Sequence, residues 1–325
     1  MSRSSGEGQG AERRVPSAET RRYMALAFTL AVLTFVALKL AEQWTPVRDA
    51  LLQARPDWLA LTAACVVVLA TYALLIQTWR IVLAGWEHPL PFWDAARIWT
   101  ISNLGKYIPG KVWALSAMAV MSEARGVSPV VAASASLYIA LINTIVGFVV
   151  VAATGARVLA MPPALVTAIV LAGLGVILAP PLLPRLGALA GRMVGRPVQI
   201  PRLPLAAVLA SALATAAAWI GYGLAFRLFV IGVLGAAPGS LALYTAVFAG
   251  SYLAGFVALF APGGIGVREA VMATGLRGAA FATGPAYLVV VASRLWLTVL
   301  EILPALLFLL MGRGWIPRRR ARVER

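Results

Sequence analysis

Long runs of apolar residues, separated by short polar stretches, cover most of this chain. The strongest of these runs cover residues 23–40, 58–79, 129–153, 160–180, 204–231, 239–260 and 285–311. Each of them approaches or exceeds the roughly 20 residues that an α-helix needs to cross a bilayer. The pattern therefore predicts an all-α fold, a polytopic integral membrane helix bundle.

Two weaker apolar segments, residues 92–124 and 262–281, each contain or begin at a Pro-Gly pair. The first reads "IPGKVWALSA" (108–117) and the second "APGGIGVREA" (261–270). Proline removes a backbone donor and ends the preceding helix, while glycine permits a tight reversal. Because unpaired backbone groups are costly in hydrocarbon, such breaks are expected to line a cavity. The two similar motifs also suggest an internal repeat. The glycines and prolines that form the breaks are Pro109, Gly110, Pro262, Gly263, Gly264 and Gly266.

The distribution of positive charge predicts how the chain lies in the membrane. Arginines cluster in the N-terminal tail, in the 185–202 loop and in the C-terminal tail, and cytoplasmic loops are the ones that carry such an excess. With all three on the cytoplasmic side, segment 92–124 must enter and leave by one face. We expect about eight spans plus a re-entrant helix pair, with both termini cytoplasmic and the protein in the plasma membrane.

The expected domains follow from this arrangement. Residues 1–20 form a disordered cytoplasmic tail, residues 21–312 the transmembrane domain and residues 313–325 a basic cytoplasmic tail.

Composition agrees with a membrane protein and restricts the partners. The 325 residues are 61% hydrophobic and only 12% charged, with a formal net charge of +16. In a soluble protein this charge would suggest nucleic-acid binding, but here the basic residues gather at the chain ends and one loop. We therefore expect contact with anionic membrane lipid and no nucleic acid.

Basic residues beside the two breaks predict a site for an anion. Lys106 and Lys111 flank the first break, and Arg268 follows the second by a few residues. Helices that restart after a break direct their positive N-terminal ends toward it, which also favours anions. Asn103 could hydrogen-bond across helices or contact a headgroup. The alternative is that both breaks are surface loops whose lysines contact lipid headgroups.

The last apolar run carries two charges, Arg294 and Glu301. Charges at the centre of a membrane helix are costly, so both should face the bundle interior. They share a helix face but lie about 10 Å apart, too far to pair directly. Glu301 therefore needs a cation from another helix, for which Arg268, Arg227 or Lys106 are available. Glu269 could line the cavity or lock a neighbouring helix, and a purely structural salt-bridge network is the alternative reading.

Residues for metal, redox or acid–base chemistry are sparse. The chain has one cysteine, Cys65, and one histidine, His88, and no carboxylates at metal-ligand spacing. We expect no metal, no cofactor and no enzymatic activity.

Asp94 and Arg97 have the i, i+3 spacing of a local ion pair on a helix.

The motif "NLGKYIPGKVW" (103–113), followed downstream by "APGGIGVREA", resembles the transmembrane region of the lysylphosphatidylglycerol synthase family, also described as flippase-like. The resemblance covers roughly residues 20 to 312. It implies movement of a lipid between leaflets, while aminoacyl transfer in that family belongs to a separate cytosolic domain, which is not expected here. Val112, Trp113 and Ala114 depart from the commonest family form after the first Pro-Gly, so the family's headgroup preference is not carried over.

These features together predict a lipid translocase. The expected substrate bears phosphate and is either a phospholipid or a polyprenyl-phosphate-linked sugar. Two alternatives remain open: a non-transporting scaffold that binds enzymes of lipid or envelope-polysaccharide synthesis, and a membrane-embedded transferase. The sequence leaves the oligomeric state open.

Overall fold

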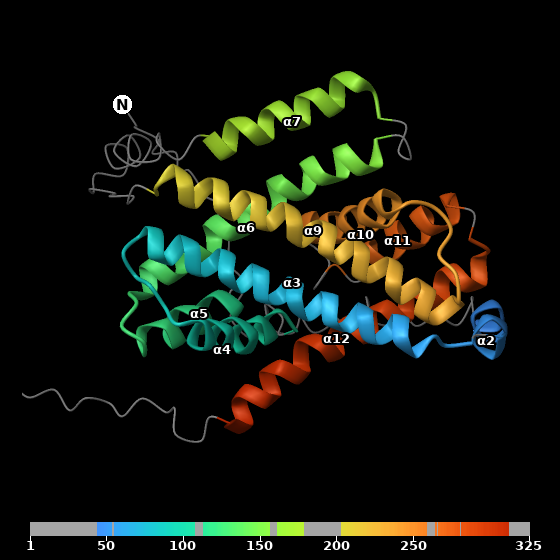
Figure 1. Cartoon of the computed structure of the whole chain (residues 1–325), viewed down its shortest axis with the longest axis horizontal. Helices are drawn as coiled ribbons and strands as arrows, with labels where there is room; N and C mark the ends of the chain where they lie inside the picture. The colour runs from blue at the N-terminus through green and yellow to red at the C-terminus, as the bar shows by residue number, and fades with distance from the viewer. Residues whose placement is uncertain are drawn as a thin grey trace, which may run out of the picture.

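The computed structural model describes residues 44–53, 55–107, 113–156, 161–178, 203–258, 264, 266–279 and 281–311. All regular structure within these ranges is helical. The helices in chain order are α2 (Trp44–Gln53), α3 (Trp58–Gly85), α4 (Phe92–Asn103), the 3₁₀ helix η1 (Leu104–Tyr107), α5 (Trp113–Glu123), α6 (Pro129–Gly155), α7 (Pro163–Leu178), α9 (Leu205–Leu234), α10 (Leu241–Val257), α11 (Val267–Gly278) and α12 (Thr283–Met311). The predicted all-α bundle is confirmed (Figure 1).

Within the described residues, four helices are long and apolar enough to cross a membrane: α3, α6, α9 and α12. They coincide with four of the predicted runs. The runs predicted over 160–180 and 239–260 are the shorter apolar helices α7 and α10. The first predicted run, 23–40, and both predicted tails, 1–20 and 313–325, lie outside the described residues.

Short polar signals begin and end the long helices. Asp57 caps α3, because its Oδ1 accepts hydrogen bonds from the backbone N–H groups of Leu59 and Ala60 at 3.0 and 3.1 Å. Gly235 ends α9 in the left-handed conformation, with φ +77°. The Asp57 N–H also donates to Gly232 O at 2.9 Å, which joins the start of α3 to the end of α9.

The order of helices repeats within the chain. A long helix (α3) is followed by a short broken pair (α4–η1 and α5) and a second long helix (α6). The same series recurs as α9, α10 with α11, and α12. The lengths match: α3 has 28 residues and α9 30, α5 has 11 and α11 12, α6 has 27 and α12 29. The predicted internal similarity of the two Pro-Gly motifs thus extends to whole halves.

The two halves run in opposite directions and pack reciprocally. In Figure 1, α3 runs from right to left and α9 from left to right, and α6 and α12 are opposed in the same way. The helices α3 and α9 pack along each other, α6 packs on α10, and α12 packs on α4. Each broken pair therefore contacts the last long helix of the other half. This is the arrangement of an inverted repeat.

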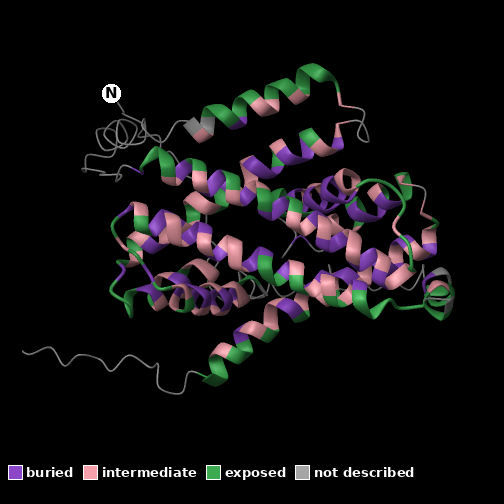
Figure 2. Cartoon of the chain, in the orientation of Figure 1, coloured by how far each residue is buried: buried purple, intermediate pink, exposed green. Residues whose placement is uncertain are grey.

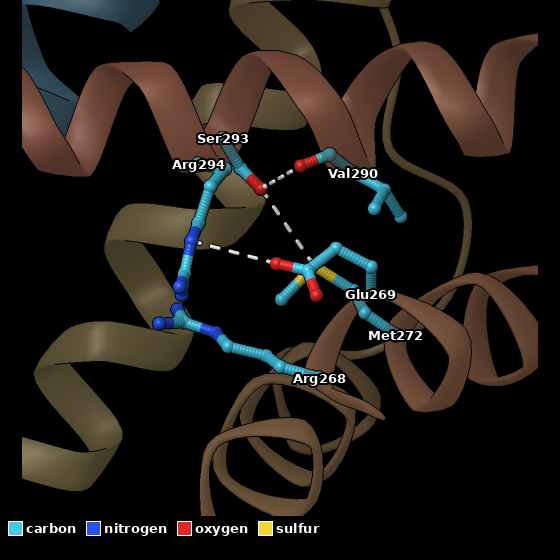
Figure 3. Close-up of a pocket in the computed structure, with 6 residues that line it drawn as sticks. All are labelled: Arg268, Glu269, Met272, Val290, Ser293 and Arg294. Atoms are coloured by element: carbon cyan, nitrogen blue, oxygen red, sulfur yellow. Dashed lines mark hydrogen bonds and ion pairs between the residues drawn. The ribbon is translucent and has the colours of Figure 1, made fainter. Parts of the chain in front are cut away.

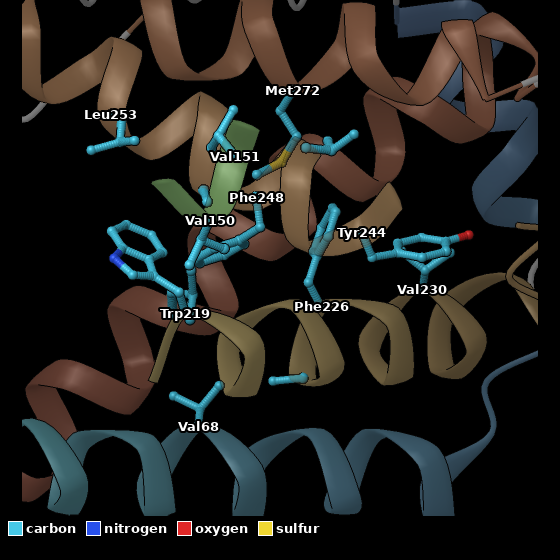
Figure 4. Packing of buried hydrophobic residues seen from close by; sticks show 14 of the residues in the cluster. Val68, Val150, Val151, Trp219, Phe226, Val230, Tyr244, Phe248, Leu253 and Met272 are labelled. Atoms are coloured by element: carbon cyan, nitrogen blue, oxygen red, sulfur yellow. The ribbon is translucent and has the colours of Figure 1, made fainter. Parts of the chain in front are cut away.

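Glycines let the helices approach closely. A Cβ on Gly223 of α9 would lie 2.0 Å from Thr245 Oγ1 of α10, and one on Gly221 would lie 2.6 Å from Thr71 Oγ1 of α3. Small residues serve the same purpose at many membrane helix interfaces. Between these contacts lies a core of aromatic and aliphatic side chains, including Trp219, Phe226 and Phe248 (Figure 4).

Exposed side chains concentrate on the outside of the bundle, on α7 and toward the end of α12 (Figure 2). Most of them are apolar. Leu171 and Leu310 are examples, exposed by 62% and 72%. Apolar residues on this scale at the surface fit a protein whose outer face meets lipid.

Candidate functional site

Two charged residues of α12 contact the broken pairs, Glu301 that of the first half and Arg294 that of the second. Glu301 Oε2 lies 2.6 Å from Lys106 Nζ. Lys106 lies in η1, at the end of the α4–η1 arm that begins the first broken pair. Arg294 Nε lies 3.4 Å from Glu269 Oε1, at the start of α11. Arg294 and Glu301 are seven residues apart, so they project from one face of α12. Residues that flank both breaks therefore converge on this face.

The first break positions Lys106 through the 3₁₀ helix η1, which continues α4 beyond Asn103. A Cβ on Gly105 would lie 2.5 Å from the backbone nitrogen of Ala114, so η1 and the start of α5 approach closely. Lys106 is 39% exposed and Glu301 20%, so the ion pair is only partly shielded. Tyr72 of α3 also donates from its hydroxyl to Glu301 Oε1, at 3.5 Å. Asn103 ends α4 half-buried.

The second break is shaped by glycine. Gly264 and Gly266 have φ values of +70° and +88°, which favour glycine. A Cβ on Gly264 would lie 2.7 Å from Gly255 Cα, so the end of α10 and the segment before α11 touch backbone to backbone. Glu269 Oε2 accepts a hydrogen bond from the Gly266 N–H at 2.6 Å. Glu269 therefore both caps α11 and holds Arg294.

Arg268 lies against an aromatic surface on α10. Its guanidinium carbon is 5.2 Å from the ring centroid of Phe248 and 5.3 Å from that of Tyr252. Aromatic faces stabilise a guanidinium in this position without neutralising it. Among the described residues, no carboxylate lies within ion-pair distance of Arg268. Its guanidinium instead lies beside that of Arg294 (Figure 3).

A small, shallow pocket lies between α11 and α12, and its side chains leave no room for a water molecule inside it. Its lining residues are Arg268, Glu269, Met272, Val290, Ser293 and Arg294. Both arginine side chains and the Glu269 carboxylate reach into the same space in Figure 3, and Ser293 lies beside them. The two guanidinium groups at this pocket can attract an anion, whereas the Ser293 hydroxyl donates to Val290 O at 2.9 Å.

An aromatic series connects this pocket with the Lys106–Glu301 pair. Phe248, beneath Arg268, stacks on Tyr222 with ring centroids 5.2 Å apart. Tyr222 in turn contacts Tyr72 at 6.2 Å, and Tyr72 donates to Glu301. Arg268 and Glu301 also lie close enough to interact electrostatically. The charged residues near both breaks therefore belong to one cluster.

The structure brings together five of the predicted site residues: Lys106, Arg268, Glu269, Arg294 and Glu301. Of the three cations considered for Glu301, Lys106 makes the direct contact. Arg294 and Glu301 form ion pairs with different residues, Glu269 and Lys106. Predicted residues that lie outside the described part of the chain are Lys111, Pro109, Gly110, Pro262 and Gly263.

The sequence did not single out Tyr72, Phe248 or Tyr252. All three lie inside apolar runs, where an aromatic residue looks like any other core residue. A tyrosine in the middle of a span is a weak signal, since its hydroxyl needs a partner there. Asp94 also has a partner that its spacing did not predict. It pairs with Arg125 at 2.9 Å, at the far end of the α4–α5 hairpin.

Within the described ranges, no three histidine, cysteine or acidic side chains gather as a metal site would require. Cys65 accepts a hydrogen bond from Trp296 Nε1 at 3.2 Å, and His88 Nδ1 lies 2.6 Å from Trp86 O in a turn.

Comparison of the chain with family profiles, curated proteins and solved structures finds no match.

Proposed function

We propose that this protein is a translocase that moves a phosphate-bearing lipid between the two leaflets of the plasma membrane. The observation that carries the proposal is the convergence of cations from both broken pairs on one face of α12. Arg268 and Arg294 would hold the phosphate, because guanidinium groups bind phosphate oxygens in a fixed geometry. Lys106, Glu301 and Glu269 would balance the charge as the site opens to each side.

We further propose that both broken pairs are re-entrant. At 1.5 Å per residue, α5 and α11 are only about 18 Å long, too short for a hydrocarbon core of about 30 Å. Each packs against the preceding arm of its own pair. The segment predicted to cross at 262–281 is then the second half of a hairpin. The number of membrane crossings stays even in this arrangement. Both termini therefore remain on the cytoplasmic side.

The inverted repeat supports transport rather than static binding. In several families of transporters, two inverted halves rock against each other around a site at their interface. Here the Lys106–Glu301 pair crosses the interface between the halves, with side chains 39% and 20% exposed. Such pairs exchange partners at lower cost than fully buried ones. A headgroup that shares Arg294 with Glu269 would weaken the contact between α11 and α12 within the second half.

The test is lipid movement in proteoliposomes, measured as headgroup accessibility to an impermeant quencher. The variant Lys106→Ala with Arg268→Ala should move anionic lipid at a small fraction of the wild-type rate. The matched control is Arg48→Ala with Arg277→Ala, which removes two exposed cations outside the cluster. Equal movement by wild type and the Lys106/Arg268 variant would defeat the assignment.

A scaffold function is the second candidate, and the Lys106–Glu301 pair favours it. The same contact would hold the halves of a static protein that gathers enzymes of lipid or polysaccharide synthesis. A scaffold would lose thermal stability in the Lys106/Arg268 variant, while the distribution of lipid between leaflets would be the same with and without the protein. Measuring both quantities on one preparation separates the two functions.

A further inference from the structure

The pocket between α11 and α12 carries an unequal set of formal charges. Its lining includes two arginines, Arg268 and Arg294, and one glutamate, Glu269. The remaining lining residues are uncharged, so the formal charges sum to +1 (two positive, one negative). The neighbouring Lys106–Glu301 pair sums to zero and does not alter this balance.

Glu269 is fixed in the pocket by two independent contacts. One oxygen accepts the Gly266 N–H at 2.6 Å, and the other lies 3.4 Å from Arg294 Nε. The carboxylate therefore stays beside the arginines whether or not a ligand is present. Any anion that reaches Arg294 must share the pocket with this negative charge.

An excess charge of either sign is unfavourable in a partly enclosed site, since few water molecules screen it. A ligand with one negative charge leaves the pocket neutral. A second negative charge would lie unbalanced beside Glu269 and would be repelled by it. The pocket should therefore discriminate between headgroups by the number of their charges.

Resting on the function proposed above, we infer that the site selects a lipid with a single phosphodiester, and that Glu269 sets this limit. Phosphodiester headgroups such as that of phosphatidylglycerol carry one negative charge. A phosphomonoester carries about 1.5 to 2 at neutral pH, and a polyprenyl diphosphate also exceeds one. The inference favours a phospholipid over a polyprenyl diphosphate among the substrates considered.

The experiment is thermal stabilisation of the purified full-length protein in detergent by added lipid at mildly alkaline pH. The probes are phosphatidylglycerol, phosphatidic acid, a polyprenyl diphosphate and inorganic phosphate. Wild type should reach half-maximal stabilisation with phosphatidylglycerol at roughly one tenth of the concentration that the lipids of higher charge need. Inorganic phosphate should not stabilise at those concentrations, and equal stabilisation by it would overturn the assignment to a lipid.

Glu269→Gln raises the formal charge of the pocket to +2 and keeps an oxygen that can accept the Gly266 N–H. This variant should lose or reverse the preference for phosphatidylglycerol. The matched control is Asp94→Asn, which removes another ion-paired carboxylate at the opposite end of the α4–η1 arm and should leave the preference unchanged. If Glu269→Gln does not fold, Arg294→Gln provides the converse test, because a pocket of zero charge should weaken binding of every anionic lipid.

Two results would overturn the inference. One is a wild type that prefers phosphatidic acid or the diphosphate. The other is a Glu269→Gln variant whose order of preference among the lipids is the same as that of wild type. In that case the translocase function stands if the Lys106/Arg268 variant still stops lipid movement. If no anionic lipid stabilises the wild type and lipid movement does not depend on Lys106 and Arg268, both proposals fail together.

Discussion

Lys106 Nζ and Glu301 Oε2 lie 2.6 Å apart and join the first half of the chain to its last helix. Seven residues earlier on that helix, Arg294 contacts Glu269 with the signs reversed. The helix α12 thus gives a carboxylate to one break and a guanidinium to the other. The first pair joins the halves and the second lies within the second half, and each gives a counter-charge to a group that would be costly in lipid alone.

Glu301→Gln is expected to lower the stability of the protein, because it removes the ion pair with Lys106. The pair is partly exposed, so we expect a loss of about 1–2 kcal/mol, between the values typical of exposed and buried pairs. The measurement is the thermal midpoint of the purified protein. Lys106→Met in the Glu301→Gln background should cost little more than Glu301→Gln alone, and strictly additive losses would show that the two residues are not coupled.

Gly223→Ala is expected to separate α9 from α10. The added Cβ would lie 2.0 Å from Thr245 Oγ1 and 2.7 Å from Thr245 Cα, so the backbones must move apart. Overpacking of this kind costs about 1–3 kcal/mol. Gly250→Ala in α10 is the control, since its Cβ would meet no atom within 4 Å and alanine favours the helix. Similar thermal midpoints for both variants would contradict the predicted close approach.

Arg268→Lys is expected to impair lipid movement although it keeps the charge. Lysine lacks the planar guanidinium that stacks on Phe248 and Tyr252 and that contacts phosphate through two N–H groups. We expect a reduction of roughly tenfold in the rate measured in proteoliposomes, with the cation–π contact alone contributing about 0.5–2 kcal/mol. Arg277→Lys, on the exposed side of the same helix, should leave the rate unchanged. If Arg268→Lys moves lipid at the wild-type rate, the positive charge alone is sufficient.

The sequence predicted the long helices because their signal is local. Runs of about 20 apolar residues identify α3, α6, α9 and α12 without knowledge of what they pack against. The short helix α2 was missed, although Trp44, Val47 and Leu51 recur on one face at helical spacing. Its ten residues are too few to resemble a membrane span. Polar residues between the apolar ones break up the run, so the apolar face is not evident from the sequence.

The candidate site was predictable in its residue types but not in its pairings. Burying a charge in a membrane requires a partner, so Glu301 was expected to find a cation. Its choice of Lys106 depends on how α12 crosses α4, which no local pattern encodes. Arg268 was expected near a break, but its aromatic support by Phe248 and Tyr252 depends on the α10–α11 hairpin folding back on itself.

The helix α7 has few contacts compared with its neighbours and lies along the outside of α6 (Figure 1). It carries the chain from the end of α6 back toward the side on which α9 begins. In the part of the chain that the structure describes, α7 is the helix between the halves, and its reversal of direction goes with the inverted orientation of the second half. Its outward side chains should tolerate exchange for other apolar residues.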